Sequence, residues 1–218
     1  MRSGGWDDVA GFVLAGGRSS RMGTDKALAD FGGEPLIARA VRLLRESGVE
    51  VSIAGAHSKL SGIAPVIEDR EPDQGPLAGV CAALAATSAP WALFLSVDLP
   101  LLPVSLLEYL LRRALVAGSA VTLVSVNGFP QTFPVVLRRD LLPLLHNELT
   151  EGRRGCFAAF HAAAAHVAEA VAILPAELLA QAGQAAHRAW LPPCEWFLNV
   201  NTPEQLRRAQ RLIAHPIA

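Results

Sequence analysis

Glycines and cationic residues are concentrated near the start of the chain, where positions 14–26 read Leu-Ala-Gly-Gly-Arg-Ser-Ser-Arg-Met-Gly-Thr-Asp-Lys. Gly16 and Gly17 let the backbone turn tightly and bring its N–H groups close to a ligand such as a phosphate chain. Arg21 and Lys26 add full positive charges that would neutralise phosphate oxygens. The spacing is neither that of a Walker A loop nor that of a dinucleotide-binding G-x-G-x-x-G pattern. We therefore expect a phosphate-binding loop; the alternative is a simple turn between a strand and a helix.

A single carboxylate, Asp98, follows an apolar run at positions 91–96 and precedes Leu99 and Pro100. If this run and the one at 9–14 are parallel strands, they end at the same edge of a sheet, where open α/β folds bind ligands. Carboxylate oxygen is the ligand type that Mg²⁺ prefers. We therefore expect Asp98 to hold Mg²⁺ against nucleotide phosphates; the alternative is a turn or cap residue.

The segment Gly75-Pro76-Leu77-Ala78-Gly79 opens a predicted apolar helix. Glycine at these positions permits close approach of a flat base or a ribose, and Leu77 would supply an apolar face. The alternative is that the glycines serve only the packing of the helix on the sheet.

Other kinds of chemistry lack support in the sequence. His161 and His166 are five residues apart, so they do not share one helix face as a zinc-binding pair would. No arrangement of Ser, His and Asp or of Cys and His has supporting local context. The three cysteines, Cys81, Cys156 and Cys194, are widely spaced and odd in number, which argues against a disulfide framework or a zinc knuckle.

The composition bounds the class of protein. The 218 residues are 51% hydrophobic, which is enough for a large core, and 19 Lys and Arg balance 20 Asp and Glu to a net charge of −1. That balance gives no indication of a nucleic-acid partner. The longest charge-free stretch, residues 74–97, is interrupted by glycine and proline, and residues 1–10 do not form a signal peptide. We expect a cytoplasmic protein that is not associated with a membrane.

Short apolar runs alternate with helical periodicity along the chain. Apolar residues repeat at helical spacing from Leu36 to Leu44, and Pro35 stands where the first residue of a helix tolerates a missing N–H. Two capping-box patterns, Ser105-x-x-Glu108 and Thr202-Pro203-x-Gln205, predict further helix starts. Strands are expected at residues 9–14, 49–54, 65–67, 91–96, 120–126, 133–137 and 197–200, and helices at 36–48, 77–86, 105–115, 139–149 and from 203 onward. In the alanine-rich segments 157–172 and 175–189 the sequence pattern does not distinguish helix from strand. The alternation predicts a single α/β domain over residues 1–218, with a mostly parallel sheet covered on both faces.

The motif Leu14-Ala15-Gly16-Gly17-x-Ser-x-Arg21-Met-Gly-x-Asp-Lys26 resembles the signature of the molybdenum cofactor guanylyltransferase family. Three later segments agree with that family in order and spacing: residues 75–79, Val97-Asp98-Leu99-Pro100, and Asn199-Val-Asn201-Thr-Pro203. The resemblance runs from the first predicted strand to the last predicted helix. It implies a three-layer, Rossmann-like nucleotidyltransferase fold.

The resemblance also implies roles for particular residues. The loop Leu14 to Gly17, together with Gly75, Pro76, Leu77 and Gly79, would bind the nucleotide, with Arg21, Lys26 and Asp98 as catalytic residues. Asn201 would join Asp98 in holding Mg²⁺ or would contact the acceptor. Asp69 would read guanine, whose N1–H and N2–H₂ donors lie side by side and match one carboxylate.

The sequence departs from the family at two places. Where the family often has an Asn after the second strand, residues 52–57 read Ser-Ile-Ala-Gly-Ala-His, which makes His57 or a backbone group the candidate for that contact. The region expected to meet the pterin, residues 128–133, keeps only Gln131. Residues 152–154, Gly-Arg-Arg, resemble the basic segment that would face the acceptor's phosphate, or form a solvated turn.

The resemblance implies transfer of GMP from GTP to the terminal phosphate of molybdopterin or its molybdenum form, with release of pyrophosphate. Proteins that deliver or accept the molybdenum cofactor are candidate partners. Two alternatives remain open. One is a molybdenum cofactor cytidylyltransferase or another small-acceptor nucleotidyltransferase of the same fold, which the Gly at position 16 disfavours, since cytidylyl-transferring relatives usually have Ala there. The other is a nucleotide-binding regulatory protein without catalysis, which would be expected to lose Lys26 or Asp98.

Overall fold

In the computed structural model, which describes residues 6–16, 25–55, 60–68 and 74–214, seven strands form one sheet in the order β3-β2-β1-β4-β6-β5-β7. β1, β2, β3 and β4 are mutually parallel, and β7 runs parallel to β5. β6 pairs antiparallel with both of its neighbours, so the predicted mostly parallel sheet is confirmed. The strands are β1 (Val9–Leu14), β2 (Glu50–Ala54), β3 (Val66–Ile67), β4 (Trp91–Ser96), β5 (Val121–Val126), β6 (Phe129–Arg138) and β7 (Ala172–Pro175).

The central strands are apolar on both faces because each face packs against a layer of helices. In β4, Leu93 and Leu95 belong to one buried cluster, whereas Ala92 and Phe94 belong to the other. Side chains alternate between the two faces of a strand, so a strand buried on both faces has a continuous apolar sequence. The Phe94 ring stacks on Phe12 of β1 at a centroid distance of 5.3 Å.

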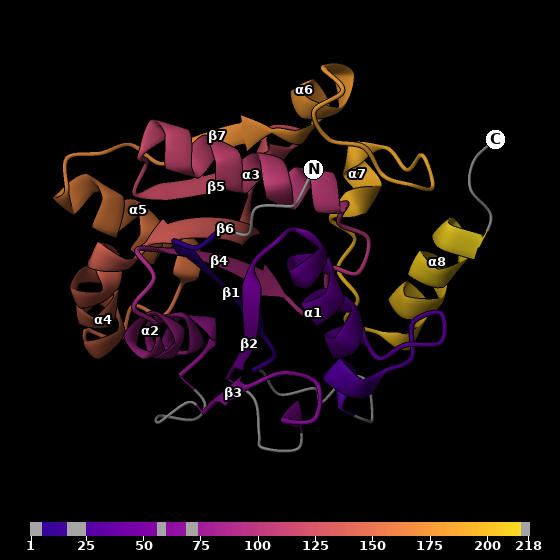
Figure 1. Cartoon of the computed structure of the whole chain (residues 1–218), viewed down its shortest axis with the longest axis horizontal. Coiled ribbons are helices and arrows are strands. Elements are labelled where there is room, and N and C mark those ends of the chain that lie inside the picture. Colours follow the sequence, from indigo (N-terminus) through magenta and orange to yellow (C-terminus); the bar gives the residue numbers. More distant parts are fainter. Residues whose placement is uncertain (1–5, 17–24, 56–59, 69–73, 215–218) are drawn as a thin grey trace.

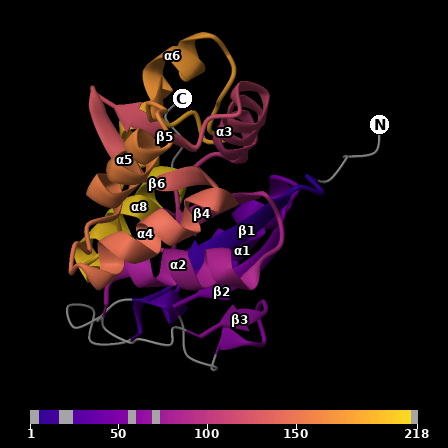
Figure 2. The same ribbon diagram turned by 90° about the vertical axis from the view of Figure 1, so that its left-hand side faces the viewer.

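Helices cover both faces of the sheet. α2, α4 and α5 contribute to the cluster around Phe94, and these three helices face the viewer in Figure 2. α1, α3 and the later helices pack on the opposite face. The helices, which Figure 1 shows around the sheet, are α1 (Leu36–Glu46), α2 (Pro76–Ala86), α3 (Val104–Ala117), α4 (Leu142–Thr150), α5 (Cys156–His166), α6 (Ala176–Gln181), α7 (Pro193–Trp196) and α8 (Pro203–Ala214), with short 3₁₀ helices η1 (Lys26–Leu28) and η3 (Arg139–Leu141). The three-layer α/β architecture expected from the sequence is confirmed.

Three expectations about individual elements are wrong. Ser105 does not cap a helix: α3 begins at Val104 after Pro103, and the Ser105 hydroxyl instead donates to Ala186 O and accepts from Ala186 N. Residues 197–200 form no strand: they follow α7 directly and have no regular secondary structure. Pro35 lies one residue before α1, with extended ψ of 146°, rather than at its first position.

The alanine-rich segments resolve into mixed structure. The first contains most of α5, and β7, which adds a parallel strand beside β5, lies at the junction of the two segments. The second contains α6, followed by a loop up to α7. Among the described residues, no helix is both long and apolar enough to cross a membrane.

Candidate active site at the carboxyl edge of the sheet

Four parallel strands end at one edge of the sheet and place the segments that follow them side by side. β1 is followed by Ala15 and Gly16, β2 by Gly55, β3 by Glu68, and β4 by Val97 and Asp98. The Val97 N–H donates to Leu14 O at 3.2 Å, which extends the β1–β4 pairing to the residue before Asp98. The two motifs singled out in the sequence therefore meet at this edge, which lies at the lower side of the molecule in Figure 1.

Lys26, Asp98 and Asn201 form a cluster at this edge. The Lys26 ammonium donates to Asp98 Oδ2 at 3.1 Å and to Asn201 Oδ1 at 2.7 Å. The side chains of Lys26 and Asp98 are 17% and 18% exposed, so the pair is shielded yet open to a ligand. The motifs and the family resemblance indicated these three residues, and the structure brings them together.

Lys26 is presented by the 3₁₀ helix η1. The Asp25 side chain accepts from Ala27 N at 3.1 Å, and Leu28 N donates to Asp25 O at 3.0 Å. An acidic residue at such a cap satisfies N–H groups that have no partner within the helix. Ala27 is buried, so the turn is anchored and Lys26 is held toward Asp98.

The backbone around Asp98 is fixed from two sides. Val200 N donates to Asp98 O at 2.9 Å, and Arg39 Nε on α1 donates to Pro100 O at 2.6 Å. The Arg39 guanidinium also lies 4.8 Å from the centroid of the Phe31 ring. Burial, together with the charge of Arg42, lowers the pKa of Arg39, although the Glu34 carboxylate opposes this shift. Arg39 is thus a structural support for the Asp98 turn.

Asn201 is positioned by the start of α8. Gln205 N donates to Thr202 Oγ1 at 3.2 Å, as the capping-box prediction required. The Gln205 side chain reaches back to accept from Asn201 N at 2.8 Å, one residue earlier than in the usual box. The cap therefore fixes the backbone of Asn201 as well as the helix.

At Gly16 the backbone after β1 passes close to the backbone after β2. Ala15 N donates to Ala54 O at 3.0 Å, and a Cβ atom at Gly16 would lie 2.9 Å from Gly55 O. Only glycine lets the segment after β1 pass this close to the segment after β2. Gly17 and Arg21 lie outside the described residues.

The 75–79 segment divides into two parts. Gly75, with a φ of +83°, and Pro76 are exposed at the start of α2. Leu77 is fully buried, and Gly79 faces Leu14 on β1, as helix–sheet packing requires. Leu77 therefore packs into the core beneath α2, so its side chain gives no apolar face for a base.

Several other expected contacts lie away from the cluster or outside the described residues. Asp69 and His57 are outside them. The Gln131 amide donates to Phe129 O within β6. Arg153 donates to both carboxylate oxygens of Glu148, at 2.6 and 2.7 Å, after α4.

Comparison with known proteins gives the family. Residues 11–161 match the MobA-like NTP transferase domain. A molybdenum cofactor guanylyltransferase of Xanthomonas euvesicatoria is 35% identical over 209 residues, which are 91% of this chain and 92% of that protein. The chain belongs to the MobA-like NTP transferase family. The resemblance inferred from the motifs is confirmed.

Further relatives agree with this assignment. A molybdenum cofactor guanylyltransferase of Pseudomonas putida KT2440 is 40% identical over 147 residues, which are 65% of this chain and 76% of that protein. The crystal structure of molybdopterin-guanine dinucleotide biosynthesis protein A from Archaeoglobus fulgidus has a TM-score of 0.74 at 21% identity and covers 94% of this chain and 98% of that one. A Thermus thermophilus 2-C-methyl-D-erythritol 4-phosphate cytidylyltransferase has a TM-score of 0.63 at 16% identity. The match covers 93% of this chain and 98% of that one. These two structures share the fold.

The oxygen donors in this MobA-like chain fit a hard divalent cation. Asp98 and Asn201 both direct a side-chain oxygen at one positive group, the Lys26 ammonium. Within the described part of the chain, no three His, Cys, Asp or Glu side chains are grouped as a metal site. Mg²⁺ is commonly bound by one or two protein ligands with water and substrate phosphates completing its shell, so two protein oxygens suit it.

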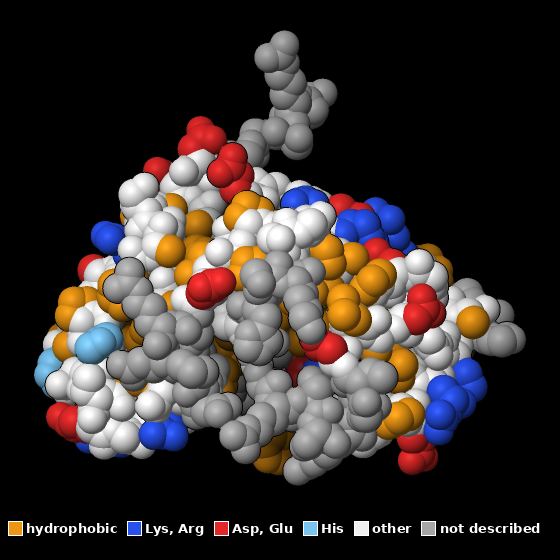
Figure 3. Space-filling view, turned by 90° about the horizontal axis from the view of Figure 1, so that it is seen from below, with side chains coloured by type: hydrophobic (Ala, Val, Ile, Leu, Met, Phe, Trp, Pro, Cys, Tyr) orange, Lys and Arg blue, Asp and Glu red, His pale blue; other side chains and the backbone are white. Residues whose placement is uncertain are grey.

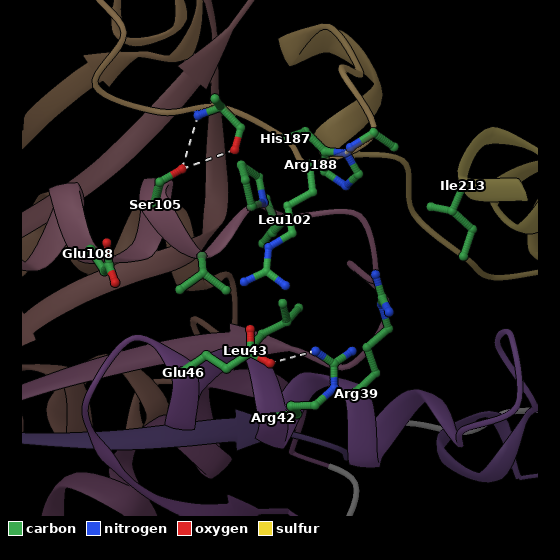
Figure 4. Close-up of a pocket in the computed structure, with 14 residues that line it drawn as sticks. Arg39, Arg42, Leu43, Glu46, Leu102, Ser105, Glu108, His187, Arg188 and Ile213 are labelled. Carbon is green, nitrogen blue, oxygen red and sulfur yellow. Dashed lines mark hydrogen bonds and ion pairs between the residues drawn. The ribbon is translucent and has the colours of Figure 1, made fainter. Parts of the chain in front are cut away.

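Two grooves of this MobA-like chain are lined by residues other than Lys26, Asp98 and Asn201. One, of about 480 Å³, separates α1 from α3 and residues 186–189, and Arg188 points into it in Figure 4. The other, of about 1200 Å³, runs between α2 and α4 and has Arg154 and Gly152 among its lining residues. On the face shown in Figure 3, acidic and basic side chains of the described residues are interspersed, in keeping with the balanced charge.

No sequence pattern indicated that Arg39 and Gln205 support the cluster. Arg39 sits on the polar side of a helix, where an arginine ordinarily contacts solvent. Gln205 is part of the predicted capping box. Only the fold shows that its side chain accepts from Asn201 N, and that the Asn201 side chain accepts from Lys26.

Proposed function

We propose that this chain transfers GMP from GTP to the terminal phosphate of molybdopterin, or of its molybdenum form, and releases pyrophosphate. The observation that carries the proposal is the cluster of one ammonium and two side-chain oxygens at the edge where the glycine-rich loop begins. The relatives named as molybdenum cofactor guanylyltransferases support the choice of nucleotide and acceptor.

In this reaction an oxygen of the acceptor phosphate attacks the α-phosphorus of GTP, and the bond to the bridging oxygen of pyrophosphate breaks. The attacking group is already anionic, so no general base is required, and positioning with charge neutralisation dominates. Lys26 and Arg21 stabilise charge on the phosphates. Asp98 and Asn201 hold Mg²⁺, which neutralises phosphate charge when bound.

The nucleotide is held by the loop at Leu14, Ala15, Gly16 and Gly17 and by the exposed start of α2 at Gly75 and Pro76. Asp69 reads the guanine edge by accepting from its two adjacent donors. GTP then lies across the carboxyl ends of β1, β2 and β4, as is general for ligands of open α/β sheets.

The chain acts as one nucleotidyltransferase domain over residues 1–218, and its macromolecular partners are proteins that deliver or accept the molybdenum cofactor. We place it in the cytoplasm. Cys156 and Cys194 are free thiols, as is usual in a reducing compartment. Burial and the neighbouring Cys81 raise the pKa of the Cys156 thiol to about 12, which keeps it protonated.

The test is to incubate purified protein with molybdopterin, Mg²⁺ and one of GTP, CTP or ATP, and to identify the dinucleotide product by mass spectrometry. We expect the guanine dinucleotide and one pyrophosphate per product, with little product from CTP or ATP. Preferential cytidylyl transfer would identify a cytidylyltransferase. Nucleotide binding without any product from the three triphosphates would favour a regulatory protein.

A further inference from the structure

The Lys26 ammonium occupies the position between the two oxygens that are proposed to bind the metal. We propose that Lys26 makes the site selective for a divalent cation already chelated by the nucleotide triphosphate, and excludes the free cation. The inference rests on the proposed function, because it concerns the metal and the triphosphate of that same site.

A divalent cation would compete with the Lys26 ammonium for the same two oxygens. Lys26 Nζ lies 3.1 Å from Asp98 Oδ2 and 2.7 Å from Asn201 Oδ1, so one unit of positive charge is already bound by both oxygens. A divalent cation binds such oxygens at about 2.0–2.6 Å. It would therefore have to enter beside the ammonium, and two cations in so small a space repel each other.

The backbones that carry the two oxygens are held in place, which limits how far the oxygens can move apart. The Asp98 backbone is held by Val200 N, and the Asn201 backbone by the Gln205 side chain. The Lys26 side chain is the mobile member, since it has a flexible four-carbon stem. The two oxygens are released when Lys26 donates instead to an acceptor on a ligand.

A triphosphate provides that acceptor and also completes the metal shell. Its oxygens accept from Lys26 and coordinate the cation, so the ammonium and the metal no longer compete for the same two oxygens. Among the described residues Asp98 is not part of any group of three His, Cys, Asp or Glu side chains that would offer a free cation a richer site. Cation and nucleotide affinities are then coupled, and such coupling is reciprocal.

The test measures binding of Mn²⁺, a paramagnetic substitute for Mg²⁺, without nucleotide and without turnover. Free Mn²⁺ is followed by electron paramagnetic resonance during titration of the wild-type protein and of Lys26→Met, which retains the length of the side chain without its charge. We expect wild-type protein to bind Mn²⁺ weakly and Lys26→Met to bind it at least 10-fold more tightly. Adding GTP should strengthen Mn²⁺ binding to the wild type far more than to the variant.

Three controls define the result. Arg188→Met removes the same charge from the groove between α1 and α3, and should leave Mn²⁺ affinity unchanged. Adding Asp98→Asn to Lys26→Met should abolish the tight binding, which locates the ion at the cluster. Lys26→Gln serves as a second neutral variant if Lys26→Met does not fold by circular dichroism.

Mn²⁺ affinity in the neutral variants equal to or below that of the wild type would overturn the inference. That result together with guanylyl transfer by the wild type would leave the proposed function intact. Tighter Mn²⁺ binding together with no transfer from GTP, CTP or ATP would support the role of Lys26 and reject the proposed function.

Discussion

Asp98 acts through its charge, because its side chain accepts from Lys26 while its backbone carbonyl accepts from Val200 N. Asn would preserve the shape of the side chain and one acceptor oxygen. It would remove the negative charge that binds the ammonium and, in the proposed function, the metal. The effect on chemistry can therefore be separated from the effect on folding.

For Asp98→Asn we expect kcat for guanylyl transfer to fall by about 10²–10³-fold, the range for loss of one preorganised electrostatic group. The melting temperature should change by only a few degrees, because Asp98 lies at the edge of the sheet outside the core. Steady-state kinetics and calorimetry on the same preparation measure both quantities. A folded variant with near-normal kcat would remove Asp98 from the active site.

Asp69→Asn tests the choice of base. The amide would place a donor opposite a guanine donor, and loss of a bidentate contact costs about 1–3 kcal/mol of discrimination. We expect kcat/KM for GTP to fall about 10- to 100-fold. ITP, which lacks the 2-amino group, should lose less, because it forms only the N1–H contact. Equal losses for GTP and ITP would show that Asp69 does not read the base.

At this scale the sequence predicted the identities of the cluster residues but not all side-chain directions. Lys26 and Asp98 follow from their charges and their places after predicted strands, whereas the role of Asn201 came from the family resemblance. The strand expected before Asn201 does not form. Leu77 could not be assigned in the same way. Whether an apolar residue on the first turn of a helix faces the sheet or the ligand depends on the rotation of that helix, which packing decides.

At the scale of elements, proline marked helix starts more reliably than the Ser-x-x-Glu pattern. Pro76, Pro143, Pro193 and Pro203 lie in the first turns of α2, α4, α7 and α8. Pro103 directly precedes α3, so Ser105 is already inside that helix and its hydroxyl contacts a distant loop. The fixed φ of proline suits a helix start wherever it stands, whereas a hydroxyl can find other partners.

The β5–β6 hairpin has a local sequence signal at Asn127 and Gly128. Asn127 and Gly128 have φ values of 51° and 79°. Asn-Gly favours this left-handed turn between antiparallel strands. The pair therefore explains why β6 is the strand that reverses direction. By contrast, β7 is four residues long within an alanine-rich region, and its pairing with β5 depends on tertiary contacts.

Gly16→Ala tests the close approach of the segments after β1 and β2. The new Cβ would lie 2.9 Å from Gly55 O, a backbone atom that cannot rotate away. We expect the free energy of unfolding to fall by about 1–3 kcal/mol. Each kcal/mol lowers the melting temperature of a domain of this size by about 2–4 °C. KM for GTP should rise as the loop is displaced.

Gly62→Ala is the matched control, because a Cβ at Gly62 meets no atom within 4 Å. Thermal melts and GTP kinetics of the two variants measured side by side give the comparison. Equal behaviour of the two variants would show that the loop after β1 accommodates a side chain.

At the scale of the whole molecule, a second charged network lies at the opposite edge of the sheet from the cluster. Glu169 accepts from Ala120 N at 2.7 Å and from Arg138 Nη1 at 2.8 Å, next to the start of β5 and the end of β6. These hydrogen bonds, with that from Ala120 first, lower the pKa of Glu169 below its ordinary value of 4.5. Stability from this carboxylate is therefore present above about pH 4.5 and is lost as the pH falls through the lowered pKa.

Glu169→Gln should reduce the free energy of unfolding by about 0.5–1 kcal/mol at pH 7. The difference from wild type should shrink as the pH is lowered below 4.5, where the wild-type carboxylate becomes protonated. Urea denaturation at several pH values measures this, with Glu50→Gln as an exposed control. Guanylyl transfer at pH 7 should be unaffected. A stability difference that does not depend on pH would mean that the Glu169 charge contributes nothing.

The hydrogen bond between Lys26 and Asn201 joins residues 175 positions apart. A domain generally folds as a unit. Trp196, Val200 and Ala209, which flank Asn201 in the sequence, are buried in the same core cluster as residues of α1 and α3. The segment that supplies the last oxygen of the cluster is therefore also part of the core, and a chain cut before Trp196 would lose stability together with its site.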